Sequence, residues 1–361
     1  MAGIFQNGAY INGFDYANAL SEIFDFVSGS GASLSSGTTR FGSGQSLQLT
    51  SNNSAGKNLL TQLATKYDGI AFITAALPSS GWFVLYEWYD STGSGAVQVS
   101  LQYNQQGALG FFKGSGTGTQ LGSSSANGII AAGRWVFLEA EVVFSVASGS
   151  VTLYAWGPNG NNGASPVISA TSVDTAPSGN AWTDRIYFIT PSGGPTHNYD
   201  DWYNLDATGS SPLNTFLGNG RVQTDAPTSD ATPNQFTSSD SQTTGNHYKD
   251  VNQLPVSSDS KYLFDNNVGD EELFGFPNLT ASQVLIINEI IRTELDASGS
   301  RTVETVLSSS SATQNGTAFQ PSTTFAFYNT LSAVDPNTGS PWASGTVAAA
   351  QSAKLGLKIA S

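Results

Sequence analysis

Residues 134–156 carry the pattern that most constrains what this chain can fold into. In the first part, RWVFLEAEVVF, every second residue is apolar, and these residues are Val136, Leu138, Ala140, Val142 and Phe144. A SVASGS linker follows, and VTLYAWG then alternates again. Successive side chains of a β-strand point to opposite faces, so each run has one face suited to a core. Because Gly and Ser favour turns, the segment predicts a β-hairpin.

Short runs of the same kind recur through the first 205 residues. They are rich in aromatic and β-branched residues and span residues 67–77, 82–89, 96–103, 184–189 and 200–205. Segments rich in Gly, Ser and Asn separate them. This pattern predicts an all-β fold with roughly nine to eleven strands before residue 206. The segment FDYANALSEIFDF has helical spacing at Tyr16, Leu20 and Phe24, and it fits either a short helix or a strand followed by a loop.

The composition excludes several functional classes. The formal net charge is −14, with 13 Lys and Arg, which disfavours binding to nucleic acid or to an anionic membrane surface. There is no cysteine, so disulfides, thiolate catalysis and Cys-based zinc sites are excluded. The first residues lack the basic and apolar regions of a signal peptide, and no apolar run is long enough to span a bilayer. We therefore expect a chain that is made in the cytoplasm and carries no export signal.

The pattern changes after residues 1–206, which are predicted to form the first domain. Residues 207–280 are polar with scattered apolar anchors, and we expect them to wrap over the first domain or to connect it to a second one; a flexible linker is the alternative. Residues 281–361 predict a smaller β domain. There VLIINEIIRTEL, a Gly/Ser turn and RTVETVL fit a hairpin, although the first run also has helical spacing behind a Thr280–Gln283 capping box.

Several segments resemble virion structural proteins of tailed bacteriophages. The hairpin at Arg134–Trp156, followed by DRIYF and DDWYNLD, is similar to the hairpin and last two strands of a concanavalin A-like (laminin-G-like) sandwich. FLGNGRVQTDAP (Phe216–Pro227), HYKDVNQLPVSSDSKYLF (His247–Phe264) and DPNTGSPW (Asp335–Trp342) then follow in the order of those phage proteins. Gln253 replaces an acid of the family pattern, and the first segment lacks the Asp of that pattern. The resemblance implies a concanavalin A-like jelly-roll sandwich followed by a smaller C-terminal β domain.

The resemblance also implies a function in a phage particle. We expect a structural component of the particle surface, such as a capsid decoration, spike, fibre or tail component, that acts through assembly contacts and is not an enzyme. Its partners would be further copies of itself (a homo-oligomer) and other virion proteins, with no nucleic acid and no membrane, and its location would be the virion. The alternatives are a carbohydrate-binding adhesin for attachment to host surface glycan and, less favoured, a glycoside hydrolase.

Glu139 and Glu141 are the candidate catalytic carboxylates. They lie at i and i+2 on one predicted strand, so they share a face, as the acids of glycosidases with a concanavalin A-like fold do. Val143 and Phe144 stand where such enzymes carry a third acid. A surface that faces solvent or an assembly partner is the favoured interpretation, and we expect no catalytic residue.

Asp200 and Asp201 are the candidate metal ligands. Together with a neighbouring carbonyl and Asn198 or Asn204 they would supply part of a Ca²⁺ site, which needs roughly six to eight oxygens. Adjacent residues of a strand point to opposite faces, so an Asp that caps a turn is the alternative. We expect no other cofactor.

Trp82, Tyr86 and Trp88 are the candidate carbohydrate-binding residues. They share one face of a predicted strand, and aromatic rings stack on sugars; a core or an inter-subunit contact is the alternative. His197 and His247 are the two histidines of the chain, and they lack the spacing of metal ligands. Both are predicted to be loop side chains with backbone partners.

Overall fold

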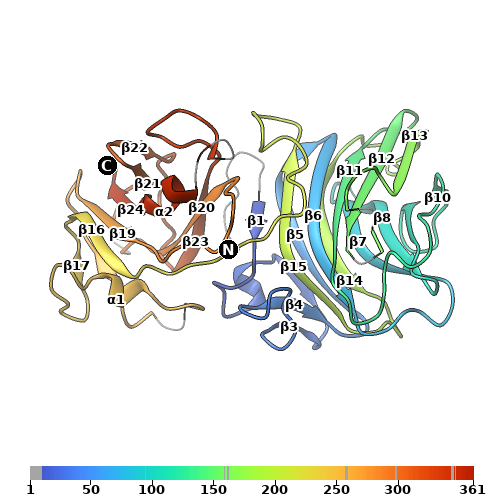
Figure 1. The fold of residues 1–361 in the computed structure, drawn as a ribbon, viewed down its shortest axis with the longest axis horizontal. Coiled ribbons are helices and arrows are strands. Elements are labelled where there is room, and N and C mark those ends of the chain that lie inside the picture. The colour runs from blue at the N-terminus through green and yellow to red at the C-terminus, as the bar shows by residue number, and fades with distance from the viewer. Residues whose placement is uncertain are drawn as a thin grey trace. The chain divides into compact units, whose positions relative to one another are not determined.

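The computed structural model describes residues 10–93, 95–157, 159–160, 162–256, 259–296, 299–342, 345 and 347–361, without the side chain of Leu60. The chain is nearly all-β, with 43% of residues in strands and 4% in helices, which confirms the predicted fold class (Figure 1). No helix of the described residues is long and apolar enough to cross a bilayer. Contacts group these residues into two compact units, one made of residues 10–15 and 19–222 and the other of residues 16–18 and 223–361.

The first unit is a sandwich of two antiparallel sheets. The strands of one sheet, in spatial order, are β13 (Ile168–Val173), β12 (Gly149–Trp156), β11 (Val136–Val143), β6 (Thr65–Thr74), β15 (His197–Asp206), β4 (Ser46–Leu49) and β3 (Ala32–Ser35), with β1 (Tyr10–Asn12) also paired to β15. The strands of the other are β10 (Gln120–Leu121), β9 (Leu109–Lys113), β8 (Ala96–Asn104), β7 (Trp82–Asp90), β14 (Thr183–Thr190), β5 (Asn53–Leu63) and β2 (Phe26–Ser28). We call them the β6 sheet and the β7 sheet.

The hairpin predicted at residues 134–156 forms as β11 and β12. The two strands pair from Phe137 opposite Trp156 to Val143 opposite Ser150. Its apolar face points towards the β7 sheet, and the side chains of this face have almost no exposed surface. Alternation along each strand therefore separates a core face from an outer face, as the sequence pattern requires.

The segment with helical spacing near the N-terminus contains one turn of 3-10 helix, η1 (Leu20–Glu22). Its apolar residues Leu20, Ile23 and Phe24 are buried in the sandwich unit. Phe24 contacts the rings of Phe14, Phe188 and Trp202 at centroid distances of 6.1, 5.6 and 6.4 Å. Burial of these aromatic rings, and not helix propensity, holds this segment in place.

The second unit contains a five-stranded sheet and two smaller ones. The larger sheet has the strands β16 (Ser229–Asn234), β19 (Glu271–Gly275), β24 (Lys354–Ile359), β21 (Val303–Ser309) and β22 (Ala312–Asn315), in this order. The two-stranded sheets pair β17 (Thr237–Ser238) with β18 (Leu263–Phe264) and β20 (Ile287–Thr293) with β23 (Ala326–Ser332). The unit also holds the short helices α1 (Tyr248–Val251) and α2 (Val347–Ser352).

The hairpin predicted from VLIINEIIRTEL and RTVETVL is wrong in its pairing. Both strands exist, as β20 and β21, but β20 pairs with β23 and β21 pairs with β22 and β24. The turn residues 297 and 298 lie outside the described residues. Alternation shows that a segment is a strand, but its partner is decided by which ladder buries its apolar face.

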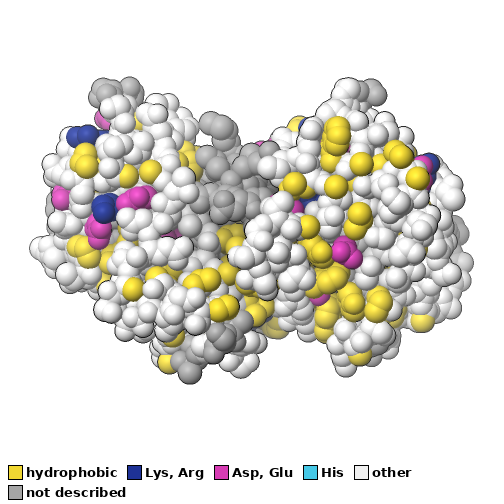
Figure 2. Space-filling model, turned by 90° about the horizontal axis from the view of Figure 1, so that it is seen from above, with side chains coloured by type: hydrophobic (Ala, Val, Ile, Leu, Met, Phe, Trp, Pro, Cys, Tyr) yellow, Lys and Arg dark blue, Asp and Glu magenta, His cyan; other side chains and the backbone are white. Residues whose placement is uncertain are grey.

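Charged side chains are sparse on the surface. Figure 2 shows a few small groups of acidic and basic side chains among mostly uncharged atoms on the face in view. This agrees with a charged fraction of 11%, against roughly 25% in typical domains.

Candidate functional site

The candidate site lies on the outer face of the β7 sheet and centres on Glu87. The neighbours of Glu87 along the strand, Tyr86 and Trp88, point inward and donate hydrogen bonds to Asp68 of β6 at 2.7 and 2.6 Å. Because side chains alternate along a strand, Glu87 points outward. The registers place it in the middle of a row that crosses the seven strands of this sheet, formed by Phe26, Gly56, Tyr187, Glu87, Ser100, Phe112 and Gln120.

The Glu87 carboxyl is buried and unpaired. The residue is 8% exposed, and no residue in the described ranges forms a hydrogen bond or ion pair with its carboxyl. Burial penalises the charged form and raises the pKa of Glu87 to about 7. At neutral pH the group is therefore a mixture of acid and carboxylate, and it can donate as well as accept a hydrogen bond.

Two neutral polar side chains of β8 lie beside Glu87. Ser100 is directly opposite it in the ladder, and Gln102 lies one diagonal step away, within roughly 7–8 Å. The Gln102 amide nitrogen donates to the Ser100 hydroxyl at 2.9 Å, and the Gln102 Oε1 is a buried acceptor without a partner in the described part of the chain. Gln102 and Ser100 are both 0% exposed, so Glu87 is the polar side chain of this group that reaches the surface.

Aromatic side chains flank this polar centre on both sides. Trp82 packs edge-on against Phe112, with ring centroids 5.0 Å apart. Tyr187 contacts Tyr89 and Phe26 at centroid distances of 5.7 and 6.2 Å. Phe26 is 37% exposed, and Trp82, Tyr89 and Tyr187 are partly exposed. Flat rings around a few polar groups are the composition of a small-molecule or sugar site.

The predicted carbohydrate-binding residues need a correction. Trp88 is 0% and Tyr86 2% exposed, and both point into the core, so neither ring offers a surface to a sugar. Trp82 alone remains at the surface. A bulge between Val84 and Tyr86 puts Trp82 on the outer face with Glu87. Tyr86 and Trp88 lie on the inner face, so strict alternation grouped the wrong residues and missed Glu87. The available signal was a single acid in the middle of the aromatic run WFVLYEWY.

Asp200 and Asp201 are engaged by groups of the protein itself. Asp201 pairs with the Arg40 guanidinium at 2.9 Å and accepts the Val222 N–H at 2.7 Å, while Asp200 accepts the Arg40 N–H at 3.0 Å. Burial and the neighbouring Asp201 raise the pKa of Asp200 to about 7. No group of three or more His, Cys, Asp or Glu suited to a metal occurs in the described ranges. Calcium at this pair stays a prediction.

Glu139 and Glu141 lie on the outer face of the β6 sheet, as the pattern predicts, but a later segment covers part of this face. The Glu139 carboxyl accepts hydrogen bonds from the Tyr203 hydroxyl and, at 2.6 Å, from the Gly218 N–H. Glu139 is 1% exposed, and burial raises its pKa. Phe216 packs its ring against aromatic rings of the same sheet. The Glu139 carboxyl therefore holds the segment around Phe216 and Gly218 against the sheet.

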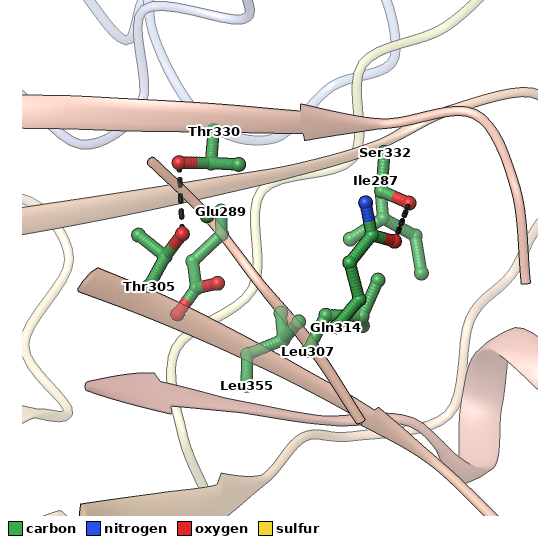
Figure 3. A pocket seen from close by; sticks show the side chains of 9 residues that line it. Ile287, Glu289, Thr305, Leu307, Gln314, Thr330, Ser332 and Leu355 are labelled. Atoms are coloured by element: carbon green, nitrogen blue, oxygen red, sulfur yellow. Dashed lines mark hydrogen bonds between the residues drawn. The ribbon is translucent and has the colours of Figure 1, made fainter. Parts of the chain in front are cut away.

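The second unit has a pocket between β20, β21 and β23 (Figure 3). Figure 3 shows Glu289 pointing into it, beside the hydrogen-bonded pairs Thr305–Thr330 and Ser332–Gln314. The cavity volume is about 10 Å³, which is room for one water molecule at most. This pocket does not accommodate a sugar or another organic ligand.

Neither histidine occupies a loop position open to solvent. His197 begins β15 and is 0% exposed, with its ring nitrogens in contact with the Tyr103 hydroxyl at 2.8 Å and the Ile189 carbonyl at 2.9 Å. Burial lowers the pKa of His197 to about 4. His247 is buried against Glu272, with Nδ1 and Oε1 3.0 Å apart. The loop position is wrong for His197, which lies in a strand, but its predicted backbone partner is present as the Ile189 carbonyl. His247 lies in the turn before α1, as predicted, and its ring is buried against a carboxylate.

Comparison of this structure with solved structures finds proteins that have the same type of fold. No protein-family model matches the chain, and no curated protein matches it. An alginate lyase from a Chlorella virus matches at 10% identity and a TM-score of 0.35 over 50% of this chain and 90% of the lyase. Peanut lectin matches at 12% identity and a TM-score of 0.35, over 56% and 98%. The catalytic domain of a glycoside hydrolase family 131 protein from Coprinopsis cinerea matches at 16% and 0.29, over 49% and 75%.

The matched structures bear on two expectations. They have concanavalin A-like lectin and glycosidase sandwiches, in agreement with the predicted fold. The matched proteins are mainly glycoside hydrolases and lyases, which contradicts the prediction that the chain is not an enzyme. At these identities and TM-scores the likeness concerns the fold, so function is argued from the residues of this chain.

Proposed function

We propose that the sandwich unit binds a carbohydrate on the outer face of the β7 sheet, around Glu87. The observation that carries the proposal is the unpaired, buried Glu87 carboxyl in the middle of an aromatic face. Sugars combine hydroxyl groups with apolar C–H faces, so they need a few polar groups next to flat rings. The Glu87 carboxyl supplies the polar group, and Tyr187, Tyr89, Trp82 and Phe26 supply the rings.

We propose further that this binding serves attachment at the surface of a tailed-phage particle. The support is the order of three segments of the sequence, Phe216–Pro227, His247–Phe264 and Asp335–Trp342, which resemble virion structural proteins. Other copies of the chain and other virion proteins are then its partners. Mass spectrometry of purified particles tests this location independently of the sugar site, and a chain that never co-purifies with particles would argue against it.

Cleavage of the bound carbohydrate is a second candidate function, favoured by one observation. A pKa of about 7 is the value at which a carboxyl works best as a general acid or base at neutral pH. In the described part of the row across the β7 sheet, Glu87 has no second carboxylate beside it, whereas common glycosidases use a pair. Release of reducing ends or of unsaturated sugars from polysaccharide, lost in Glu87→Gln, is the measurement for this activity.

Binding to a polysaccharide array, followed by titration, tests the proposed site. Tyr187→Ala and Glu87→Ala are expected to weaken affinity at least tenfold, or about 1.4 kcal/mol each. Glu141→Gln, on the outer face of the other sheet, is the matched control and keeps wild-type affinity. Because a sugar removes water from Glu87 and favours its neutral form, wild-type affinity is expected to fall as pH rises through about 7. Equal affinity of all four proteins would refute the site.

A further inference from the structure

The face that carries Glu87 also holds the guanidinium of Arg185, on β14. Arg185 is opposite Tyr89 in the ladder and Tyr187 is opposite Glu87. Arg185 and Glu87 are therefore diagonal neighbours, within roughly 7–8 Å. Ile186, between Arg185 and Tyr187, is 0% exposed. Because side chains alternate along a strand, Arg185 points outward with Tyr187, and it is partly exposed.

Aromatic rings and hydrogen bonds fix the orientation of the Arg185 guanidinium. Its Cζ lies 4.1 Å from the centroid of the Phe26 ring and 5.5 Å from that of the Tyr89 ring. Its Nε–H donates to the Asn58 Oδ1 at 2.8 Å, and its Nη1 donates to the Tyr187 hydroxyl at 3.3 Å. These contacts hold the plane of the guanidinium before a ligand arrives, which lowers the entropy cost of binding.

Gly56 makes room for this arrangement. In the ladder it lies between Phe26 and Tyr187, and a Cβ at this position would be 2.3 Å from the Tyr187 Cε1. The Tyr187 ring therefore lies over the backbone of Gly56, and its centroid is 6.2 Å from that of Phe26. The missing side chain thus lets the rings of Tyr187 and Phe26 come together beside Arg185.

No carboxylate in the described part of the chain forms an ion pair with Arg185. Asp184, beside it in the chain, accepts hydrogen bonds from the N–H and the hydroxyl of Ser91 at 2.7 and 2.8 Å. Asp25, just before β2, pairs with Lys57 at 3.5 Å. The sequence has 27 acidic and 13 basic residues, so an arginine that none of these acids neutralises is available to an anion from outside.

We propose that Arg185 binds the negatively charged group, carboxylate or sulfate, of an acidic polysaccharide at this face. The inference rests on the carbohydrate site proposed above and names the class of sugar that this site takes. The guanidinium has more N–H donors than its hydrogen bonds to Asn58 and Tyr187 use. The remaining donors can form two parallel hydrogen bonds to an anionic group, and the exposed rings pack against the sugar.

The other charges of the protein make this preference informative. Burial raises the pKa of Glu87 to about 7, so part of the carboxyl is neutral near pH 7 and does not repel an anion bound to Arg185. The net charge of −14 repels polyanions in general. Tighter binding of an acidic sugar than of its neutral counterpart therefore requires a local site of positive charge.

Pairs of polysaccharides that share a backbone test the preference. The probes are polygalacturonate and hyaluronan with their carboxyl-reduced forms, and carrageenan and chondroitin sulfate with their desulfated forms. We expect the wild-type chain to bind an acidic member at least tenfold more tightly than its neutral form, and the pair that shows this distinguishes carboxylate from sulfate. Arg185→Gln should bind both members with the affinity of the neutral form. Exposed Arg134→Gln, before β11 of the other sheet, removes the same charge and should keep the preference.

The outcomes separate failure of this inference from failure of the carbohydrate site. Equal binding of acidic and neutral members, lost in Tyr187→Ala, would overturn the anion contact and leave the carbohydrate site standing. A preference that persists in Arg185→Gln would also overturn the role of Arg185. No binding to any member would overturn both proposals.

Circular dichroism checks that each variant folds, because Arg185 packs on aromatic rings. Arg185→Lys is the second variant, since it keeps the charge and can keep the ring contact but lacks the planar fork. It should retain only part of the preference for the acidic form. Full retention would overturn the contact through two parallel hydrogen bonds.

Discussion

Glu289 couples the stability of the second unit to pH at the scale of a single residue. It is 6% exposed, its Oε1 has no partner in the described part of the chain, and burial raises its pKa well above the usual value of glutamate. The cavity beside it holds at most one water. The protonated side chain is therefore the form that the fold accepts, and ionisation requires either unfolding or a rearrangement of β20.

The sign of the pH effect follows from linkage. Below the pKa of glutamate in the unfolded chain, about 4.3, both states are protonated and the contribution of Glu289 to stability is fully present. This contribution is lost as pH rises through the raised pKa of the folded state, at about 1.4 kcal/mol per pKa unit. Glu289→Gln is expected to raise the thermal midpoint at pH 8 and to flatten its pH dependence. Exposed Glu294→Gln is the control; if both variants keep the wild-type slope, Glu289 is not the titrating group.

The residues of the candidate site show why alternation alone did not find it. Both faces of β7 carry aromatic side chains, and a bulge between Val84 and Tyr86 moves Trp82 to the face opposite Tyr86 and Trp88, so alternation shows neither the grouping nor which face is inside. Tyr86 and Trp88 are drawn inward because Asp68 accepts a hydrogen bond from each. This interaction joins residues of two different sheets, so no local pattern predicts it. Once the inner face is known, the outward position of Glu87 follows from the same alternation.

At the scale of elements, residues 216–222 form a strap over the outer face of the β6 sheet. Phe216 packs between Tyr67 and Tyr154, with ring centroids 5.1 and 5.2 Å away. The Gly218 N–H donates to Glu139 at 2.6 Å, and Arg40 donates to the Gly220 carbonyl at 2.8 Å. The strap has no regular secondary structure, so these anchors replace the ladder that would otherwise satisfy its backbone.

Removal of the central anchor is expected to loosen the strap. Glu139→Ala leaves the Tyr203 hydroxyl and the Gly218 N–H without their acceptor and should cost about 2–4 kcal/mol in urea unfolding. Trypsin should then cleave faster after Arg221. Glu141→Gln, two residues away and partly exposed, keeps an acceptor for the Tyr67 hydroxyl, so it is the matched control and should change both readouts little. An unchanged cleavage rate in Glu139→Ala would show that the aromatic packing of Phe216 is sufficient.

The elements differ in how far the sequence predicts them. The β11–β12 hairpin is local, and its alternation and Ser/Gly turn specify both strands and their pairing. The pairing of β20 with β23 joins segments that are far apart in the chain, and neither strand carries a turn signal that points to the other. Strand identity was therefore predictable in both units, and strand partners only where a short turn connects them.

At the scale of the whole molecule, the surplus of acidic residues affects the stability of the fold. There are 27 acidic and 13 basic residues, which give a net charge of −14 and a pI near 4.3. Exposed or partly exposed ion pairs such as Lys113–Asp174 and Lys261–Asp240 contribute little, because water and salt screen them. Repulsion among the surplus acids is also screened by salt, but it favours expansion of the chain.

Added salt weakens the ion pairs, which lowers stability, and weakens the repulsion among acids, which raises it. Because acids are in surplus, we expect the net effect of salt to be stabilising. We expect the thermal midpoint at pH 8 to rise by roughly a few degrees between low and physiological salt, because the Debye length shortens to about 8 Å and the acids repel each other less. Sodium chloride titration followed by circular dichroism measures this shift. Near the pI the repulsion vanishes, so the same titration at pH 4.3 is the control and should show no stabilisation. A midpoint that falls with salt at pH 8 would mean that the few ion pairs outweigh the net charge.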